Sequence, residues 1–233
     1  MSTYITAAKN KCNKKTGKMF IDAILGGFMI ASGGFASQVI TATGLPKAVA
    51  AAVFSIGLVM VVLTGSELFT GNCLMVGGIV KGELSIKEVI YNWIIVYLGN
   101  LVGALLMAIS VSVIGISEEQ TGVIIDAANT KLSLSTPEML VRGILCNVLV
   151  CIAVWMAVNV NETIGKVFCA ALPVFVFVLC AFEHSVANMF FLPAAAMLQG
   201  HFYPAIIYQI AIVTIGNIIG GGLIGAALEF RRK

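Results

Sequence analysis

The sequence predicts an all-α integral membrane protein with six transmembrane helices, arranged as an inverted 3+3 repeat whose second and fifth helices are broken. The first observation is composition: 59% of the 233 residues are hydrophobic and only 11% are charged, whereas soluble domains carry about 25% charged residues. The second is a series of uncharged runs long enough to span a bilayer. The third is a pair of short polar segments, one in each half, that interrupt such runs.

Six apolar segments account for most of the chain. A spanning helix needs about 20 mostly apolar residues. The uncharged run 185–228 is too long for one helix and is divided at the polar stretch 199–204. The predicted spans are therefore 18–41, 47–76, 86–116, 136–160, 163–198 and 204–229. No stretch is typical of a soluble domain, so residues 1–233 form one predicted transmembrane domain, with repeat halves of about 1–116 and 136–233.

The first span follows a lysine-rich start, a combination that also occurs in signal peptides. Its uncharged run, 23–46, exceeds the 7–15 residues of a signal-peptide core, so we expect it to be retained as a transmembrane helix. With both termini inside, eleven basic residues, including 231–233, fall on the inner side, and only Lys47, Lys131 and Arg142 fall outside. This positive-inside bias predicts a multi-pass protein of the cell (inner or plasma) membrane with both termini cytoplasmic. It also accounts for the net charge of +3, which gives no reason to infer a nucleic-acid partner.

The second and fifth spans carry the polar segments, at 65–72 and 182–188. Each places a carboxylate, Glu67 or Glu183, at membrane depth beside residues that disfavour a continuous helix. A charge there costs roughly 2.5 kcal/mol or more and is a functional candidate by default. Matched interruptions in the two halves of a chain are typical of transport proteins with a site at the bilayer midplane.

The third and sixth spans carry matched Gly-Asn motifs at 98–103 and 215–220. Asn100 follows Glu67 by 33 residues, and Asn217 follows Glu183 by 34. Because each half has an odd number of spans, the second half must enter the membrane from the opposite side, which makes the repeat inverted. The Gly-x-x-x-Gly spacings also have a plain packing role, since small residues let helices approach closely in lipid.

The polar segments have the chemistry of an anion site. A broken helix exposes N-terminal N–H groups near the midplane, and these favour negative charge. Thr70 adds a hydroxyl, Asn188 an amide, and His184 the one side chain that titrates near neutral pH. The two carboxylates are open to a second interpretation, in which they hold free backbone N–H groups near the breaks. His201, beside the outer turn, is expected to be solvated or interfacial.

Other residues give weaker signals. The aromatic and aliphatic residues Phe54, Leu58, Phe69 and Phe177 would ordinarily be core or lipid-facing, but Phe54 and Leu58 share a helical face and would form an apolar constriction if that face lined the axis. Lys131 falls in a predicted outer loop, where it is expected to be solvated. The six cysteines have no C-x-x-C spacing and are expected to be small buried hydrophobes, without a metal or cofactor.

The motifs at 67–72, 146–156 and 183–189 together resemble those of the formate–nitrite transporter family, over nearly the whole chain. The resemblance implies an aquaporin-like fold and a homopentamer with one pore per protomer. It also implies transport of small monovalent anions such as formate, nitrite or hydrosulfide, with acetate or lactate in some members. Two narrow apolar slits would close each pore around a chamber.

The same resemblance assigns roles to residues of this chain. It implies an outer slit containing Phe54 and Phe177, an inner slit containing Leu58, Leu68 and Phe69, and a central His184 facing Thr70. Asn147 matches a polar residue of the fourth span, and Lys131 matches a vestibule lysine that draws anions in. Gly71-Asn72 and the short connection at 44–46 resemble the hydrosulfide-channel branch, so the substrate remains open.

The predicted function is therefore a channel or transporter for small monovalent anions, coupled to protons through His184, and not an enzyme. A channel for water or small neutral solutes is the alternative, although Asn188 is followed by Met189 and the sequence has no Asn-Pro-Ala motif. A membrane enzyme or haem protein would need more clustered ligands than His184 supplies. A purely structural protein would not keep two carboxylates and a histidine at midplane depth.

Overall fold

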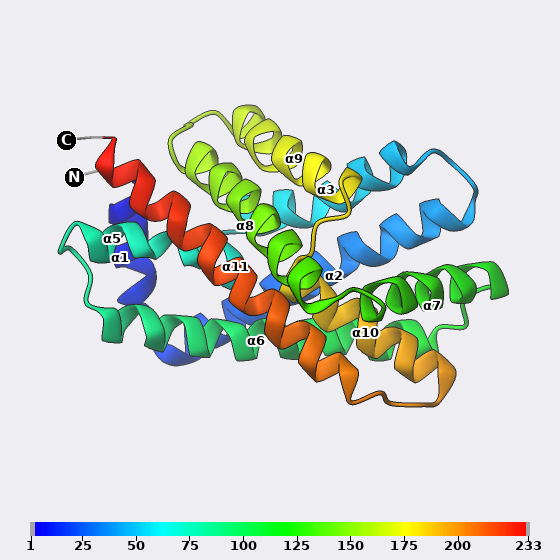
Figure 1. Cartoon of the computed structure of the whole chain (residues 1–233). Coiled ribbons are helices and arrows are strands. Elements are labelled where there is room, and N and C mark those ends of the chain that lie inside the picture. The colour runs from blue at the N-terminus through cyan, green and yellow to red at the C-terminus, as the bar shows by residue number, and fades with distance from the viewer. Residues whose placement is uncertain (1–2, 232–233) are drawn as a thin grey trace.

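The computed structural model describes residues 3–231, and these are entirely helical and irregular, without strands. Arg232 and Lys233, two of the basic residues counted above, lie outside the described residues. In chain order the helices are α1 (Thr3–Cys12), α2 (Thr16–Ala42), α3 (Lys47–Thr64), α4 (Phe69–Asn72), the 3-10 turn η1 (Cys73–Met75), α5 (Val76–Val80), α6 (Ile86–Val113), α7 (Glu118–Leu132), α8 (Thr136–Val158), α9 (Thr163–Leu179), α10 (Ser185–Gln199) and α11 (Ala205–Phe230). Figure 1 shows their arrangement.

Each predicted span coincides with observed helix. Five helices of the described chain, α2, α3, α6, α8 and α11, are long and apolar enough to cross a membrane. The predicted second span comprises α3 and the short helices α4 to α5, and the fifth comprises α9 and α10. Both spans are interrupted where the polar segments predicted a break.

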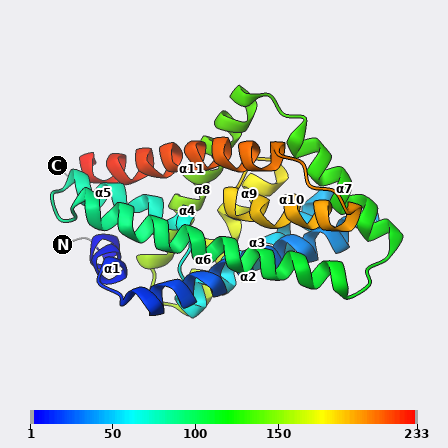
Figure 2. The ribbon, with the colours of Figure 1, turned by 90° about the horizontal axis from the view of Figure 1, so that it is seen from below.

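Two helices were not predicted. α1 and α7 both lie outside the apolar spans, and Figures 1 and 2 place them at opposite ends of the molecule. The placement of Lys131 in a loop is therefore wrong, because Lys131 belongs to the last turn of α7. Ser117 and Gln120 form a capping box that starts α7, and this pairing satisfies N–H groups that would otherwise have no partner.

The long helices pack as pairs, α2 along α6 and α8 along α11. Glycines at the crossings permit this approach: a Cβ added to Gly103 would lie 2.0 Å from the Ile24 carbonyl oxygen, and one on Gly220 would lie 2.2 Å from that of Ile144. The packing role expected for these glycines is thus confirmed. α3 and α9 pack against each other between the pairs, and the two broken segments run in opposite directions (Figure 1).

Both breaks begin with a residue in the left-handed region. Gly65 has φ 69° and ends α3, whereas Ala181, with φ 55°, lies just beyond the end of α9. A residue with a side chain rarely adopts this conformation, so surrounding contacts must hold Ala181 in place. The chain then becomes extended through Leu68 in one half and His184 in the other before α4 and α10 begin.

Candidate functional site

Two cavities enter the molecule from its opposite ends. The α7-side cavity has a volume of about 240 Å³ and is lined by Phe54, Phe177, Lys131, Glu183 and His184, among others. The α1-side cavity has a volume of about 300 Å³, and its lining includes Lys11, Leu58, Leu68, Val154 and Lys166. Residues from both breaks therefore line cavities, as expected of irregular backbone at membrane depth.

A small chamber of about 10 Å³ lies between the two cavities. Phe54, Phe177 and His184 line both this chamber and the α7-side cavity, whereas Leu58 lines both the chamber and the α1-side cavity. The rings of Phe54 and Phe177 meet edge to face, with centroids 5.8 Å apart. The two cavities are thus separated by apolar side chains on either side of the chamber.

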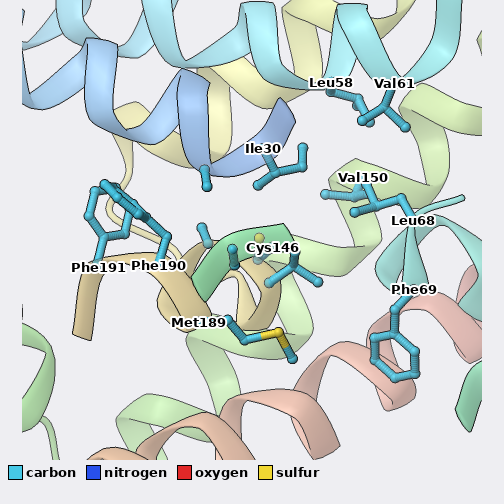
Figure 3. Close-up of a cluster of buried hydrophobic side chains, with 14 of the residues drawn as sticks. Ile30, Leu58, Val61, Leu68, Phe69, Cys146, Val150, Met189, Phe190 and Phe191 are labelled. Carbon is cyan, nitrogen blue, oxygen red and sulfur yellow. The ribbon is translucent and has the colours of Figure 1, made fainter. Parts of the chain in front are cut away.

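Figure 3 shows how the side chains on the α1 side of this barrier lie. Leu58 and Val61 of α3 point toward Val150 of α8 and toward Leu68. Phe69 points away from them (Figure 3) and packs edge to face on Tyr97 of α6, at a centroid distance of 4.9 Å. Phe69 therefore lines neither cavity nor the chamber, and its predicted place in the inner slit does not fit the structure.

Thr70 and His184 join the two breaks. Their Oγ1 and Nε2 atoms are 2.9 Å apart, and the amide of Ala187 donates to His184 Nδ1 at 3.1 Å. Because Nδ1 accepts this hydrogen, the neutral imidazole carries its proton on Nε2 and donates it to the threonine hydroxyl. The ring also stacks on Phe177, with centroids 5.8 Å apart and planes 8° apart. His184 thus serves as the N-cap of α10 and faces the chamber.

Two asparagine side chains form hydrogen bonds with backbone amide and carbonyl groups at the breaks, and the two sets of bonds follow the same pattern. Asn100 accepts the amide of Phe69 at 2.9 Å and donates to the carbonyls of Ala23 and Glu67 at 2.7 and 2.9 Å. Asn217 accepts the amide of Ser185 at 2.9 Å and donates to the carbonyls of Gly143 and Glu183 at 2.7 and 3.0 Å. The matched asparagines of the sequence are therefore matched in contact as well.

The buried carboxylates have different partners from those expected. Glu67 is fully buried and pairs with Lys11 at 3.0 Å and Lys14 at 2.7 Å. Glu183 pairs through both oxygens with Lys131, at 3.0 Å each. None of the hydrogen bonds found for these carboxylates in the described chain comes from a backbone N–H, because the asparagines take that role. A buried carboxylate held by a cation and by amides is the arrangement in which its charge is best tolerated.

Amide side chains complete both carboxylate networks. Asn72 donates to Glu67 at 2.9 Å and to Asn92 at 2.9 Å, and Asn188 donates to Glu183 at 2.7 Å and to the oxygen of Gln209 at 3.1 Å. Asn188 therefore lies in the Glu183 network, away from the chamber lining. Asn147 donates to the carbonyls of Thr70 and Asn217 at 3.1 and 2.6 Å, so it braces the threonine loop through its backbone.

Several residues of these networks were missed from the sequence. The unpredicted members are Lys11, Lys14, Asn92 and Gln209. Asn92 and Gln209 each precede their matched asparagine by eight residues, a signal that the repeat contained. No comparable signal placed Lys11 and Lys14, because their contacts depend on how α1 folds back against the bundle. His201 is exposed, packs edge to face on Tyr203 and is absent from the chamber lining.

The described residues contain no group of three or more His, Cys, Asp or Glu side chains that could hold a metal ion. The six cysteines are free, and Cys73, Cys146 and Cys151 are buried. Cys12, on α1 outside the apolar spans, is partly buried, and burial raises the pKa of its thiol to about 11.

Known proteins resemble this chain over most of its length. A probable formate transporter of Methanothermobacter thermautotrophicus is 37% identical, over 91% of this chain and 87% of that protein. The formate channel FocA of Haemophilus influenzae is 35% identical, over 93% and 87%. Among solved structures, a pentameric formate channel with formate bound superposes with a TM-score of 0.81 at 30% identity, covering 93% of this chain and 97% of that one. An ion channel of the FNT family superposes with a TM-score of 0.82 at 25% identity, covering 98% and 99%.

The family model described as formate/nitrite transporter matches residues 1–230. The relatives are channels and transporters, and five helices of the described chain have the length and composition to span a bilayer. These findings describe a multi-pass membrane protein, and the chain belongs to the formate/nitrite transporter family.

Proposed function

We propose that this protein conducts small monovalent anions, with formate, nitrite and hydrosulfide as candidate substrates, and that protons are coupled to the flux through His184. One observation carries the proposal: an apolar chamber separates two cavities from opposite ends, and it is lined by His184, whose ring is hydrogen-bonded to Thr70. A route with a single titratable group at its centre suits a weak acid, which crosses an apolar region at much lower cost when it is neutral.

The apolar side chains define two constrictions along this route. Phe54 and Phe177 stand between the α7-side cavity and the chamber, and Leu58 and Leu68 stand toward the α1-side cavity. We assign them to excluding water and hydrated ions, because a bare ion between aliphatic and aromatic walls loses its hydration without compensation. Phe69 is left out of this set because its ring packs on Tyr97.

The proton step follows from the hydrogen bonds of His184. Nδ1 holds the Ala187 amide, so an imidazolium forms only when that bond opens and Nδ1 takes a proton from water in the α7-side cavity. The Nε2–H of the imidazolium then breaks, its proton passes to Thr70 Oγ1, and the hydroxyl proton of Thr70 passes to the anion. The anion leaves as the neutral acid, and the ring is left neutral with its proton on Nδ1. Exchange with water then removes the proton from Nδ1 and returns one to Nε2, which restores the resting tautomer and the hydrogen bond from the Ala187 amide. The acid releases its proton in the opposite cavity.

The assembly and membrane placement extend the proposal. The matched contacts of Asn100 and Asn217, and of Glu67 and Glu183, support an inverted repeat of two three-span halves. The similar formate channel is pentameric, which supports a homopentamer.

The basic residues at the α1 end support placement in the cell membrane with both termini cytoplasmic, so that the α7-side cavity faces outward. Lys131 lines that cavity, where its ion pair holds the Glu183 carboxylate beside the route.

The direct test is flux of radiolabelled formate and nitrite and of hydrosulfide into liposomes that hold the purified protein, measured side by side with protein-free liposomes. We expect at least one of the three to enter faster than in the control, with a pH-dependent rate. Stopped-flow water permeability in the same liposomes separates the alternative. Rapid water flux without anion flux would reject the proposal and favour a channel for water.

A further inference from the structure

We infer that Arg142 and Lys166, rather than the lysines bound to the buried glutamates, are the cations that draw anions into the two cavities. The inference deepens the proposed anion conduction and rests on it. It assigns a role to two residues that no motif singled out, one at each mouth of the route.

Lys131 is a poor candidate for this role because its charge is already matched. Both oxygens of Glu183 lie 3.0 Å from its Nζ atom, and its side chain is only 16% exposed. The ammonium also lies 5.4 Å from the centroid of the Phe191 ring. At a distance, a bidentate ion pair presents little net charge to an approaching anion, so Lys131 chiefly stabilises Glu183.

Arg142 also lines the α7-side cavity, and its charge is much less compensated. Its one carboxylate contact in the described chain is with Glu138, at 3.9 Å. The Oε2 atom of Glu138 instead accepts from the amide and the hydroxyl of Ser135, at 2.8 and 2.7 Å, where it caps α8. The side chain of Arg142 is 34% exposed. Its guanidinium is therefore available to an anion.

Arg142 also lies next to the break that positions His184. Its carbonyl accepts the amide of Glu183 at 3.3 Å, and its guanidinium donates to the carbonyl of Ala181 at 3.4 Å. The charged groups that line the cavity are Lys47, Lys131, Arg142 and Glu183, with the titratable His184. After Lys131 and Glu183 pair, the positive charge that remains belongs to Lys47, which is exposed at the start of α3, and to Arg142 beside the break.

The equivalent position in the other half carries the opposite charge. The amide of Glu67 donates to the carbonyl of Asp22 at 3.1 Å, so Asp22 corresponds to Arg142. Asp22 pairs with Lys14 at 2.8 Å. In the α1 half the positive charges of Lys11 and Lys14 are therefore neutralised by two carboxylates, Glu67 and Asp22. The α7 half has Arg142 where that second carboxylate would be, and so retains positive charge.

Lys166 has the corresponding role at the α1-side cavity. Lys11 lines this cavity but donates to Glu67 and to Asn72, at 3.0 and 2.7 Å. Lys166, from the first turns of α9, lines the same cavity and is half-buried, and the described chain gives it no ion pair. A cation at the mouth of a cavity with apolar walls raises the local anion concentration, and salt screens this effect.

The experiment compares variants by initial influx of labelled formate into right-side-out and inside-out vesicles from producing cells, with vesicles lacking the protein as background. We expect Arg142→Gln to lower influx about threefold at an ionic strength of about 10 mM and by less than about 1.5-fold at about 500 mM, in the vesicles whose α7-side cavity faces the formate. Lys166→Gln should lower influx by the same factors in vesicles of the opposite orientation, whose α1-side cavity faces the formate. Arg142→Lys should retain the wild-type rate, and Lys87→Gln, at an exposed lysine of α6, controls for net charge.

A structural role for Arg142 would give a different pattern. If the contact with Ala181 were what mattered, Arg142→Lys would be as slow as Arg142→Gln and the loss would be equal at both ionic strengths. Either result overturns the inference, as does an effect of both variants from the same side. If the wild-type protein conducts formate above background and the variants conduct it at the same rate, this inference alone is rejected. If formate influx through the wild-type protein equals background, the proposed conduction is rejected and this inference with it.

Discussion

Thr70 and His184 are 114 residues apart in the chain, yet their side chains are hydrogen-bonded at 2.9 Å in the interior. Each belongs to the extended-to-helical junction of one break, where α4 or α10 begins. The contact brings two polar segments, each costly at membrane depth, into one site. It also means that neither break can move without consequences for the other.

Replacing His184 separates its capping role from its titration. His184→Asn retains a good N-cap for α10 but cannot titrate, whereas His184→Phe keeps the stacking on Phe177 and loses both. We expect both variants to lose the pH dependence of formate flux, measured by uptake into liposomes between about pH 5 and about pH 8. We expect only His184→Phe to unfold at a lower temperature. A wild-type pH profile in His184→Asn would remove this residue from the proton step.

Loss of either bracing asparagine should destabilise the protein. Asn100→Ala leaves the amide of Phe69 and two carbonyls without a partner in a buried region, and each such group costs about 1–3 kcal/mol. Asn217→Ala should cost a similar amount if the halves are equivalent. Thermal unfolding in detergent measures both, with Asn159→Ala as control because its bond to the Trp155 carbonyl is exposed. Unfolding temperatures indistinguishable from that of the control would show that the breaks do not depend on these amides.

The pair of Lys131 and Glu183 predicts non-additive mutations. Lys131→Met leaves a buried carboxylate without its cation, which typically costs about 3–5 kcal/mol. The double variant Lys131→Met/Glu183→Gln removes both charges and keeps an amide for the network with Asn188. It should therefore be more stable than the single variant, as measured by thermal unfolding. A double variant that is less stable than Lys131→Met would show that the pair does not hold the structure in this way.

Close helix packing predicts that Gly103 tolerates no side chain. Its added Cβ would lie 2.0 Å from the Ile24 carbonyl oxygen and 2.6 Å from the Phe28 amide, both backbone atoms that cannot rotate away. Gly103→Ala should force α2 and α6 apart at a cost of about 1–3 kcal/mol or more, seen as reduced folded yield and a lower unfolding temperature. Gly17→Ala is the control, since nothing lies within 4 Å of its added Cβ. Equal behaviour of the two variants would contradict the packing.

Most of the helical architecture could be predicted from the sequence because membrane spans leave a strong signal. Uncharged apolar runs predicted spans that each coincide with helix, and the cost of charge at membrane depth marked Glu67 and Glu183. The nearly equal spacings from the two glutamates to Asn100 and Asn217 located residues that prove to have matched contacts. Recognition of the family motifs added His184 and Thr70 as a facing pair.

What could not be predicted depends on side-chain direction and on segments outside the apolar runs. Leu68 and Phe69 are adjacent, and the extended backbone at Leu68 sends one toward the cavity and the other toward α6, a choice that no periodicity reveals. The ion pairs of Lys11, Lys14 and Lys131 depend on α1 and α7 folding back onto the bundle. Charged residues near a membrane surface ordinarily indicate solvated segments, so these partners left no signal in the sequence.

The central claim, that the anion crosses the chamber, is tested most directly by filling that chamber. Val150 of α8 lines it and is 1% exposed, whereas Leu145 on the same helix is 42% exposed on the surface of the chain. Formate influx into liposomes should be abolished by Val150→Trp and retained by Leu145→Trp, with thermal unfolding used to confirm that both variants are folded. A folded Val150→Trp variant that conducts formate as fast as the wild type would show that the route lies elsewhere.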